Sequence, residues 1–209
     1  MLEFTIGDSD FLFKGEIKDL PKLIINQENV VKITGDLNSI YIKFDELLKI
    51  KSEEKNNLSK TTFPKWCSLN LSLNIDNFTY KKIVLKEMNG KLKYNDLFFS
   101  FDSIQTNILN GKLNFNGKLY EYEKNHIALL SKIELETINI RNLFSTFNNF
   151  NQTFIQDKHL KGLVSGEIDI RSNWSPNFKL NSDNLKVSAK YIIEKGELID
   201  FLPLNKLSS

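Results

Sequence analysis

Apolar and polar residues alternate one by one along much of this chain, which is the pattern of a strand with one buried side. Between Trp66 and Asp76, every odd position from 67 to 75 is Cys, Leu or Ile, and every even position is Ser, Asn or Asp. Successive side chains of a β-strand point to opposite faces, so this segment predicts a strand with one apolar and one polar face. The same alternation recurs at residues 112–116, 132–136, 167–171 and 185–189.

The alternation also bears on how the strands pair. Strands of a parallel sheet that is covered on both faces are continuous runs of Val, Ile and Leu, whereas antiparallel sheets commonly keep one polar, solvated face. The repeated one-sided pattern therefore predicts an antiparallel sheet.

A second pattern repeats from one end of the chain to the other. Seven of the nine glycines are followed by a charged residue and then by Leu or Ile, and these are Gly15, Gly35, Gly90, Gly111, Gly117, Gly166 and Gly196. Glycine permits a positive φ angle, so we expect each to form a bulge or turn just before a strand, with the charged residue facing solvent and the Leu or Ile facing inward. Such a repeated unit predicts an elongated, stacked sheet.

Three stretches interrupt these patterns. Residues 51–65 are polar and include a proline, so we expect a linker or long loop between an N-terminal β segment (1–50) and a second β region (66–209). Residues 139–154 place apolar side chains three and four apart, which predicts an amphipathic helix that could cover one end of the apolar face. The proline at 203 is in place to begin a short terminal helix.

Composition excludes several classes of protein. With 41% hydrophobic and 26% charged residues the chain has a globular composition. Its 28 basic against 26 acidic residues leave a net charge too close to zero to favour nucleic-acid binding. One cysteine, Cys67, and two histidines, His126 and His159, exclude an internal disulfide and multi-histidine or multi-cysteine metal sites. No run approaches the ~20 apolar residues of a membrane-spanning helix, and the first residues lack the features of a signal peptide.

Catalytic motifs are missing from the sequence as well. It contains no glycine-rich phosphate loop, no nucleophile elbow and no zinc-protease motif. Asp157, His159 and Ser165 could act as acid, base and nucleophile, but chance proximity of common polar residues in a loop is the favoured interpretation. Glu134 and Glu136 would suit a glycosidase pair only if matched across a cleft, and we expect them to solvate the outer face. We therefore expect no enzyme, no catalytic residues, no cofactor and no metal.

Taken together, the segments resemble the C-terminal region of the AsmA-like family. The resemblance covers nearly the whole chain and is carried by degenerate β patterns: LNLSLNIDNFTY at 69–80, KEMNGKL at 86–92, NILNGKL at 107–113, NGKL at 116–119, NLFSTF at 142–147, LKGLVSGEI at 160–168 and IEKGELIDF at 193–201, with Pro203-Leu204 after it. Two features depart from the family pattern. Asn110-Gly111 stands where the family often has paired glycines, and an N-terminal membrane anchor is missing, so we expect the chain to be a piece of a longer parent.

The resemblance implies both a fold and a function. AsmA-like proteins are similar to bridge-like lipid-transfer proteins, are anchored in the inner membrane of Gram-negative bacteria, and have a β-rich body in the periplasm that supports outer-membrane biogenesis. Their sheet curls into a long apolar trough, proposed to let phospholipid acyl chains pass toward the outer membrane. The expected fold is thus mainly β: an elongated, curled antiparallel sheet (a β-trough) with one or two short helices. Phospholipid is the implied partner, and envelope proteins are the partners of the scaffold alternative given below.

A trough of this kind predicts an open apolar groove wide enough for an acyl chain. Its expected lipid-contacting residues are Leu69, Leu71, Leu73, Ile75, Leu113, Phe115, Ile133, Leu135, Ile168 and Ile170. The alternative is a non-enzymatic structural or assembly scaffold, whose apolar face would be filled by side chains and whose free sheet edge would accept a strand from an envelope protein.

Overall fold

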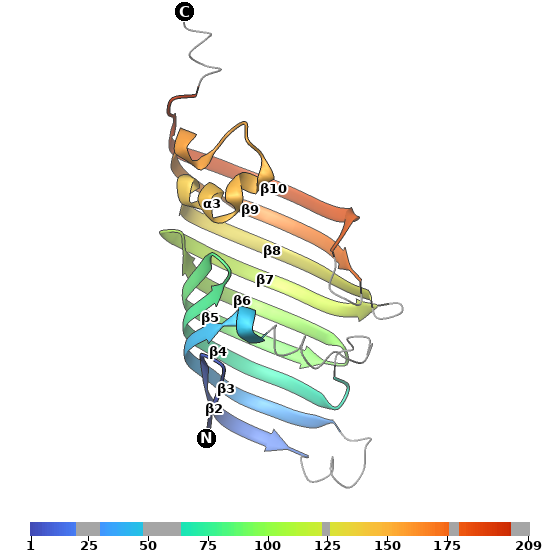
Figure 1. Cartoon of the computed structure of the whole chain (residues 1–209). Coiled ribbons are helices and arrows are strands. Elements are labelled where there is room, and N and C mark those ends of the chain that lie inside the picture. The colour runs from blue at the N-terminus through green and yellow to red at the C-terminus, as the bar shows by residue number, and fades with distance from the viewer. Residues whose placement is uncertain (20–29, 48–63, 123–125, 176–179, 202–209) are drawn as a thin grey trace, which may run out of the picture.

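Ten strands form one sheet in which each strand lies beside its neighbours in sequence, from β1 at one edge to β10 at the other (Figure 1). The computed structural model describes residues 1–19, 30–47, 64–122, 126–175 and 180–201. The strands are β1 (Leu2–Ile6), β2 (Ser9–Lys18), β3 (Val31–Lys43), β4 (Cys67–Tyr80), β5 (Ile83–Asn95), β6 (Phe98–Ile108), β7 (Gly111–Tyr122), β8 (His126–Asn139), β9 (Leu160–Trp174) and β10 (Leu180–Leu198).

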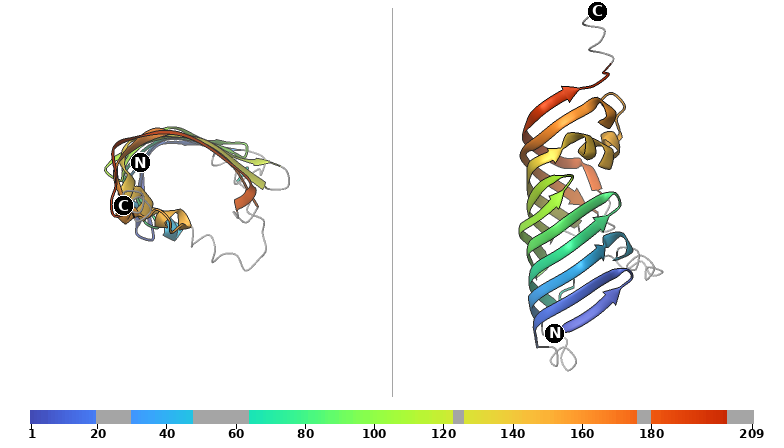
Figure 2. Two further views of the ribbon diagram at one scale, coloured as in Figure 1. Left: turned by 90° about the horizontal axis from the view of Figure 1, so that it is seen from above. Right: turned by 90° about the vertical axis from the view of Figure 1, so that its left-hand side faces the viewer.

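The sheet is curled but does not close on itself, and the protein is mainly β with only short helices, as the sequence led us to expect. Figure 2 shows the curl from above as an arc, and from the side as strands stacked along the axis of a trough. All five segments with strict alternation lie inside strands, namely β4, β7, β8, β9 and β10. The described strands on both sides of the expected linker, β1–β3 and β4–β10, belong to this one sheet. Most of that linker (residues 51–63) and the expected terminal helix lie outside the described residues.

One strand pair departs from the expected antiparallel pairing. β3 and β4 run parallel, with Val31 beside Cys67 at one end and Lys43 beside Thr79 at the other. All other neighbouring pairs are antiparallel. The parallel seam joins an antiparallel group, β1–β3, to a second one, β4–β10. One-sided alternation is the same in both kinds of pairing, which is why the sequence pattern did not reveal the seam.

The repeated glycines do not precede the strands, as we had expected. Only Gly111 begins a strand, and the other six lie inside strands. A glycine and the Leu or Ile two residues later share a face, so the charged residue between them points to the other side. On the face shared by the glycine and the Leu or Ile, a side chain in place of the glycine would collide with its neighbours. A Cβ on Gly15 would lie 2.2 Å from the carbonyl oxygen of Thr34, and one on Gly117 would lie 2.5 Å from Cζ of Phe115. The glycines therefore make room on one face of the sheet.

Bulges bend several strands, and one of them, at Lys195, lies directly before Gly196. Glu87, Ser103, Thr137 and Lys195 have φ angles of 53°, 51°, 53° and 52°, and each lies at a shift in strand register. Side chains of the adjacent strands bond two of the displaced amides: Ser103 N–H donates to Asn116 Oδ1 over 2.8 Å, and Thr137 N–H donates to Ser165 Oγ over 2.9 Å. Because a bulge bends a strand and increases its twist, these positions help to curl the sheet.

The helix expected at 139–154 is shorter than its apolar spacing suggested. Helix α3 covers Ile140–Thr146, where the Asn139 side chain caps it by accepting from Asn142 N–H, and it is followed by the 3-10 turns η2 (Asn148–Asn151) and η3 (Asp157–His159). Residues 148–151 all have φ angles between 51° and 57°, in the left-handed region, so the right-handed helix ends before them. A helical turn at 44–47, which the sequence did not predict, follows β3.

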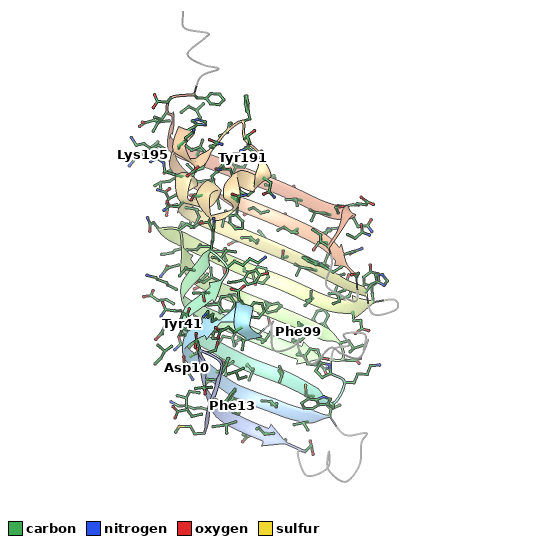
Figure 3. All side chains as sticks on the ribbon, viewed as in Figure 1. Asp10, Phe13, Tyr41, Phe99, Tyr191 and Lys195 are labelled. Atoms are coloured by element: carbon green, nitrogen blue, oxygen red, sulfur yellow. The ribbon has the colours of Figure 1, made fainter. Side chains whose placement is uncertain are left out.

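Side chains tie the hairpin of β1 and β2 to the end of β3. Backbone pairing between β2 and β3 stops at Leu12 and Asn38. Beyond that point the Asp10 carboxylate accepts the backbone N–H groups of Ile40 and Tyr41, over 3.0 and 2.7 Å (Figure 3). Burial of this carboxylate alone would raise its pKa, but these hydrogen bonds outweigh burial and hold the pKa below its usual range.

Candidate functional site

The apolar face of the sheet is its concave face. Leu47 of the helical turn after β3 packs against the buried cluster that contains Phe11 and Ile42, and Leu143 of α3 packs against the buried cluster that contains Ile138. Both helical segments lie inside the curve of the sheet, on the side that faces the viewer in Figure 1 and the open side of the arc in Figure 2. The side chains they touch therefore point into the trough.

Strand register aligns the inward residues in rows that run along the trough. Rows lie across the strands, because paired residues sit side by side on the same face. One row crosses β2 to β9 through Ile17, Ile33, Leu69, Tyr94, Phe99, Leu119, Leu129 and Ser172. A second crosses β3 to β10 through Gly35, Leu71, Leu92, Phe101, Gly117, Ser131, Ile170 and Val187. At a strand spacing of about 4.8 Å, each row is roughly 34 Å long.

Aromatic rings are concentrated in the middle of this face. The Tyr94 and Phe99 ring centroids are 4.3 Å apart, those of Phe99 and Phe101 are 6.4 Å apart, and those of Phe101 and Phe115 are 5.7 Å apart. The four rings come from β5, β6 and β7, and Phe99 is labelled in Figure 3. Of the four, only Phe115 was among the expected contact residues, although the spacing of two between Phe99 and Phe101 was a usable signal.

All ten residues expected to contact lipid lie on the concave face, on β4, β7, β8 and β9. Leu71 and Ile75 are buried, at 7% and 3% exposure. The other eight are only half-buried: Leu69, Leu73, Leu113, Phe115, Ile133, Leu135, Ile168 and Ile170. Within the part of the chain that the structure describes, no second sheet covers them, so they keep apolar surface accessible.

One enclosed part of this face lies where β4 begins. Cys67, Tyr94 and Ile127 form a buried cluster, against which Leu69 and Trp174 pack. The Tyr94 hydroxyl donates to the carbonyl oxygen of Pro64, and burial raises the pKa of both the Tyr94 phenol and the Cys67 thiol. Both groups are neutral near pH 7, so neither adds a charge to this side of the trough.

The outer face is polar, and several of its charges are paired. Lys132 lies 3.3 Å from Glu134 and 3.2 Å from Glu167, and Lys93 lies 2.8 Å from Asp102. The hydrogen bond and charge of Lys93, followed by the hydroxyl of Ser100, hold the pKa of the Asp102 carboxyl below its usual range. The two faces thus differ sharply in polarity, and the apolar rows lie on the concave face.

The polar residues that we considered as catalytic candidates are bonded to backbone or to neighbouring side chains. His159 Nδ1 accepts from Gln156 N–H over 3.1 Å, Ser165 Oγ accepts from Thr137 N–H, and Glu134 accepts from Asn114 over 3.3 Å. Among the described residues, no group of three or more His, Cys, Asp or Glu side chains could hold a metal ion.

These observations define a class: a curled, unclosed, single-layer β-sheet with an accessible apolar concave face. No protein-family model matches the chain, and no curated protein matches it either. Within the residues that can be described, none of the helices combines the length and the apolar character needed to cross a bilayer.

Proposed function

We propose that this protein is a periplasmic β-trough that binds or conducts phospholipid acyl chains between the inner and outer membranes and so supports outer-membrane biogenesis. The observation that carries the proposal is the pair of long inward rows, whose apolar side chains are largely half-buried and not covered by a second layer of described residues. The resemblance to AsmA-like proteins supplies the cellular setting, including an inner-membrane anchor in the full-length parent.

The energetics suit a ligand that moves. Each methylene group transferred from water to an apolar surface contributes about 0.8 kcal/mol, so a few contacts hold an acyl chain. Leu, Ile and Phe side chains supply these contacts without specific hydrogen bonds, and neighbouring positions along a row are similar. A chain that leaves one contact therefore meets an equivalent one on the next strand. Apolar contacts of this kind hold an acyl chain without a cofactor or a metal ion.

Photo-crosslinking from the inward face tests the proposal. The photoreactive residue p-benzoylphenylalanine replaces Phe115 or Leu73, which are half-buried inward residues, and in the matched control it replaces exposed Ser72, which points outward next to Leu73. After irradiation in cells, we expect phospholipid adducts at Phe115 and Leu73 and none at Ser72, as read by mass spectrometry. Equal lipid labelling of both faces, or labelling of protein alone at Phe115 and Leu73, would contradict the proposal.

A second candidate function is a non-enzymatic scaffold that contacts envelope proteins. It is favoured by one observation, the free edge of β10, since an exposed edge accepts an additional strand. Protein adducts from inward positions, with no lipid, would favour this second function over the first.

A further inference from the structure

Strand β10 is an unusually long free edge. All of its 19 residues are exposed, and they include large apolar side chains such as Tyr191 at 66% and Ile192 at 70%. Tyr191 is labelled in Figure 3, on the outermost strand at the upper end of the trough. One side of this strand pairs with β9, and its other side pairs with no described strand.

The middle of β10 lacks most of the devices that keep sheet edges from pairing. Between Leu185 and Ile193 there is no proline and no glycine, and the register with β9 is regular from Lys186 to Glu194. Natural proteins usually interrupt such an edge with proline, bulges or inward charges, or cover it. Here the residues that point inward are all apolar, and the two lysines, Lys186 and Lys190, point outward.

Length identifies the partner that this edge matches. The opposite edge of the sheet consists of β1, which has only five residues, and of the part of β2 beyond Phe13 that β1 does not cover, so it offers no single strand of matching length. Another β10 is the one described edge of equal length. Two copies of β10 in antiparallel pairing would be related by a two-fold axis, which is the usual symmetry of soluble dimers.

Charge selects one register for this pairing. If Ala189 lies opposite Ala189 of the second copy, Val187 faces Tyr191 and Leu185 faces Ile193, all on the concave side. On the outer side Lys190 then faces Ser188, and Lys186 faces Ile192, so no like charges meet. A shift of this pairing by two residues in one direction puts Lys186 opposite Lys190, and a shift in the other direction puts Lys190 opposite Lys190. A shift by one would exchange the faces.

We propose that β10 pairs with β10 of a second copy of this chain, antiparallel and centred on Ala189, to form a two-fold dimer with one continuous sheet. Cross-strand pairs of aromatic with β-branched residues, such as Tyr191 with Val187, stabilise antiparallel sheets, whereas like charges opposite each other destabilise them. The two concave faces lie on the same side, so the row that ends at Val187 continues into the second copy. The dimer is inferred from the edge alone and does not depend on what the trough binds.

Disulfide trapping tests the register. In the full chain with Cys67→Ser, an Ala189→Cys variant places two thiols directly opposite each other, where paired Cα atoms are about 4.5–5.5 Å apart, within the range of a disulfide. Ile192→Cys is the matched control: residue 192 is also exposed, but its two copies are offset by six residues, or about 20 Å. We expect the dimeric disulfide at 189 and not at 192. Trapping at 192, or equal trapping at both, would overturn the proposed register.

Charge substitutions test the interface without removing the strand. Val187→Lys combined with Tyr191→Lys puts lysine opposite lysine at two symmetric pairs, and we expect the dimer dissociation constant, measured by analytical ultracentrifugation, to rise about tenfold or more. Val187→Glu combined with Tyr191→Lys puts opposite charges there, and we expect it to restore dimerisation. Both positions are exposed in the single chain, and circular dichroism checks that each variant keeps its β structure. A parent chain that stays monomeric at ~100 µM, or equal loss of the dimer in both variants, would overturn the proposal and leave the edge to a strand of another protein.

Discussion

The two ends of the sheet are built differently. At the β1 end, the edge strand is five residues long, Phe4 stacks on Phe11 with ring centroids 5.0 Å apart, and Phe11 and Phe13 are buried. The Asp10 carboxylate there accepts hydrogen bonds from backbone N–H groups of β3 that have no backbone partner in β2. At the β10 end, all 19 residues of the edge strand are exposed.

This difference teaches that the sheet is terminated at one end and left open at the other. A short edge strand with side chains that satisfy neighbouring amides discourages further pairing, whereas a long exposed strand invites it. The same contrast predicts where stability resides: substitutions near β1 should be costly, and matched substitutions on β10 should be nearly silent in the monomer.

Removal of an aromatic ring from each end gives the largest expected contrast. Phe11→Ala should lower the free energy of unfolding by about 3 kcal/mol or more, because the ring is buried in a core cluster that also contains Ile42 and Ile75. Tyr191→Ala should change it by about 0.5 kcal/mol or less, because that ring is mostly exposed. Urea unfolding at a protein concentration low enough to keep the chain monomeric measures both. Similar losses of unfolding free energy in the two variants would contradict the proposed difference between the two ends.

Glycine substitutions should give the next largest contrast. Gly15→Ala sets a Cβ 2.2 Å from a backbone oxygen of β3, so strands must move apart, and we expect a loss of about 2–3 kcal/mol. Gly196→Ala on β10 meets only the Ile193 side chain at 3.0 Å, which can move aside, so we expect a loss of less than about 1 kcal/mol. Thermal unfolding of the two variants side by side checks this, and a larger drop in melting temperature for Gly196→Ala would contradict it.

Asp10 offers a smaller effect with a distinct dependence on pH. Asp10→Asn should cost about 1–2 kcal/mol at pH 7, because Ile40 and Tyr41 donate to different oxygens of the carboxylate and Asn keeps only one acceptor oxygen, which is also uncharged. The folded pKa of Asp10 lies below its usual range, so its contribution is present above the unfolded pKa of about 3.9 and is lost as the pH falls through the folded pKa.

The control for Asp10 is a carboxylate of the same strand with no structural amide to bind. Glu16 pairs with Lys18 on the surface at 2.8 Å, and both side chains are largely exposed. Glu16→Gln should leave stability unchanged within error, because exposed ion pairs contribute little. Chemical unfolding repeated between pH 3 and pH 7 should show a weaker acid dependence for Asp10→Asn than for the parent or Glu16→Gln. If the pH dependence of stability is unchanged in Asp10→Asn, Asp10 does not stabilise the β1 end of the sheet.

The sequence predicted the faces of the strands far better than their connections. Alternation such as that of residues 66–76 is local and directly sets which side chains point inward, so all ten expected contact residues lie on one face. We expected the repeated glycines just before the strands, and this was wrong for six of the seven, which lie inside strands. The spacing of two residues between Gly and Leu or Ile already indicated that both lie on the same face of a strand. Space on the concave side, not a turn, is what most of those glycines provide.

The remaining features depend on contacts that no local pattern contains. Glu87 and Ser103 adopt left-handed backbone angles within strands, yet neither residue type signals a bulge. Four consecutive left-handed residues after Thr146 end a helix whose apolar spacing would allow it to continue. The burial of Asp10 against β3 requires a hairpin to meet a strand some thirty residues away.

The parallel seam between β3 and β4 has a consequence for how the chain folds. Most pairs in the sheet join strands linked by short turns, as Tyr80 and Ile83 do in β4 and β5, so their contacts are local in sequence and close quickly. Every contact across the seam joins residues far apart, from Val31 with Cys67 to Lys43 with Thr79, so chain entropy opposes it much more strongly. Two meanders, β1–β3 and β4–β10, can thus form independently as separate kinetic units, and their docking along the seam is the non-local step of folding.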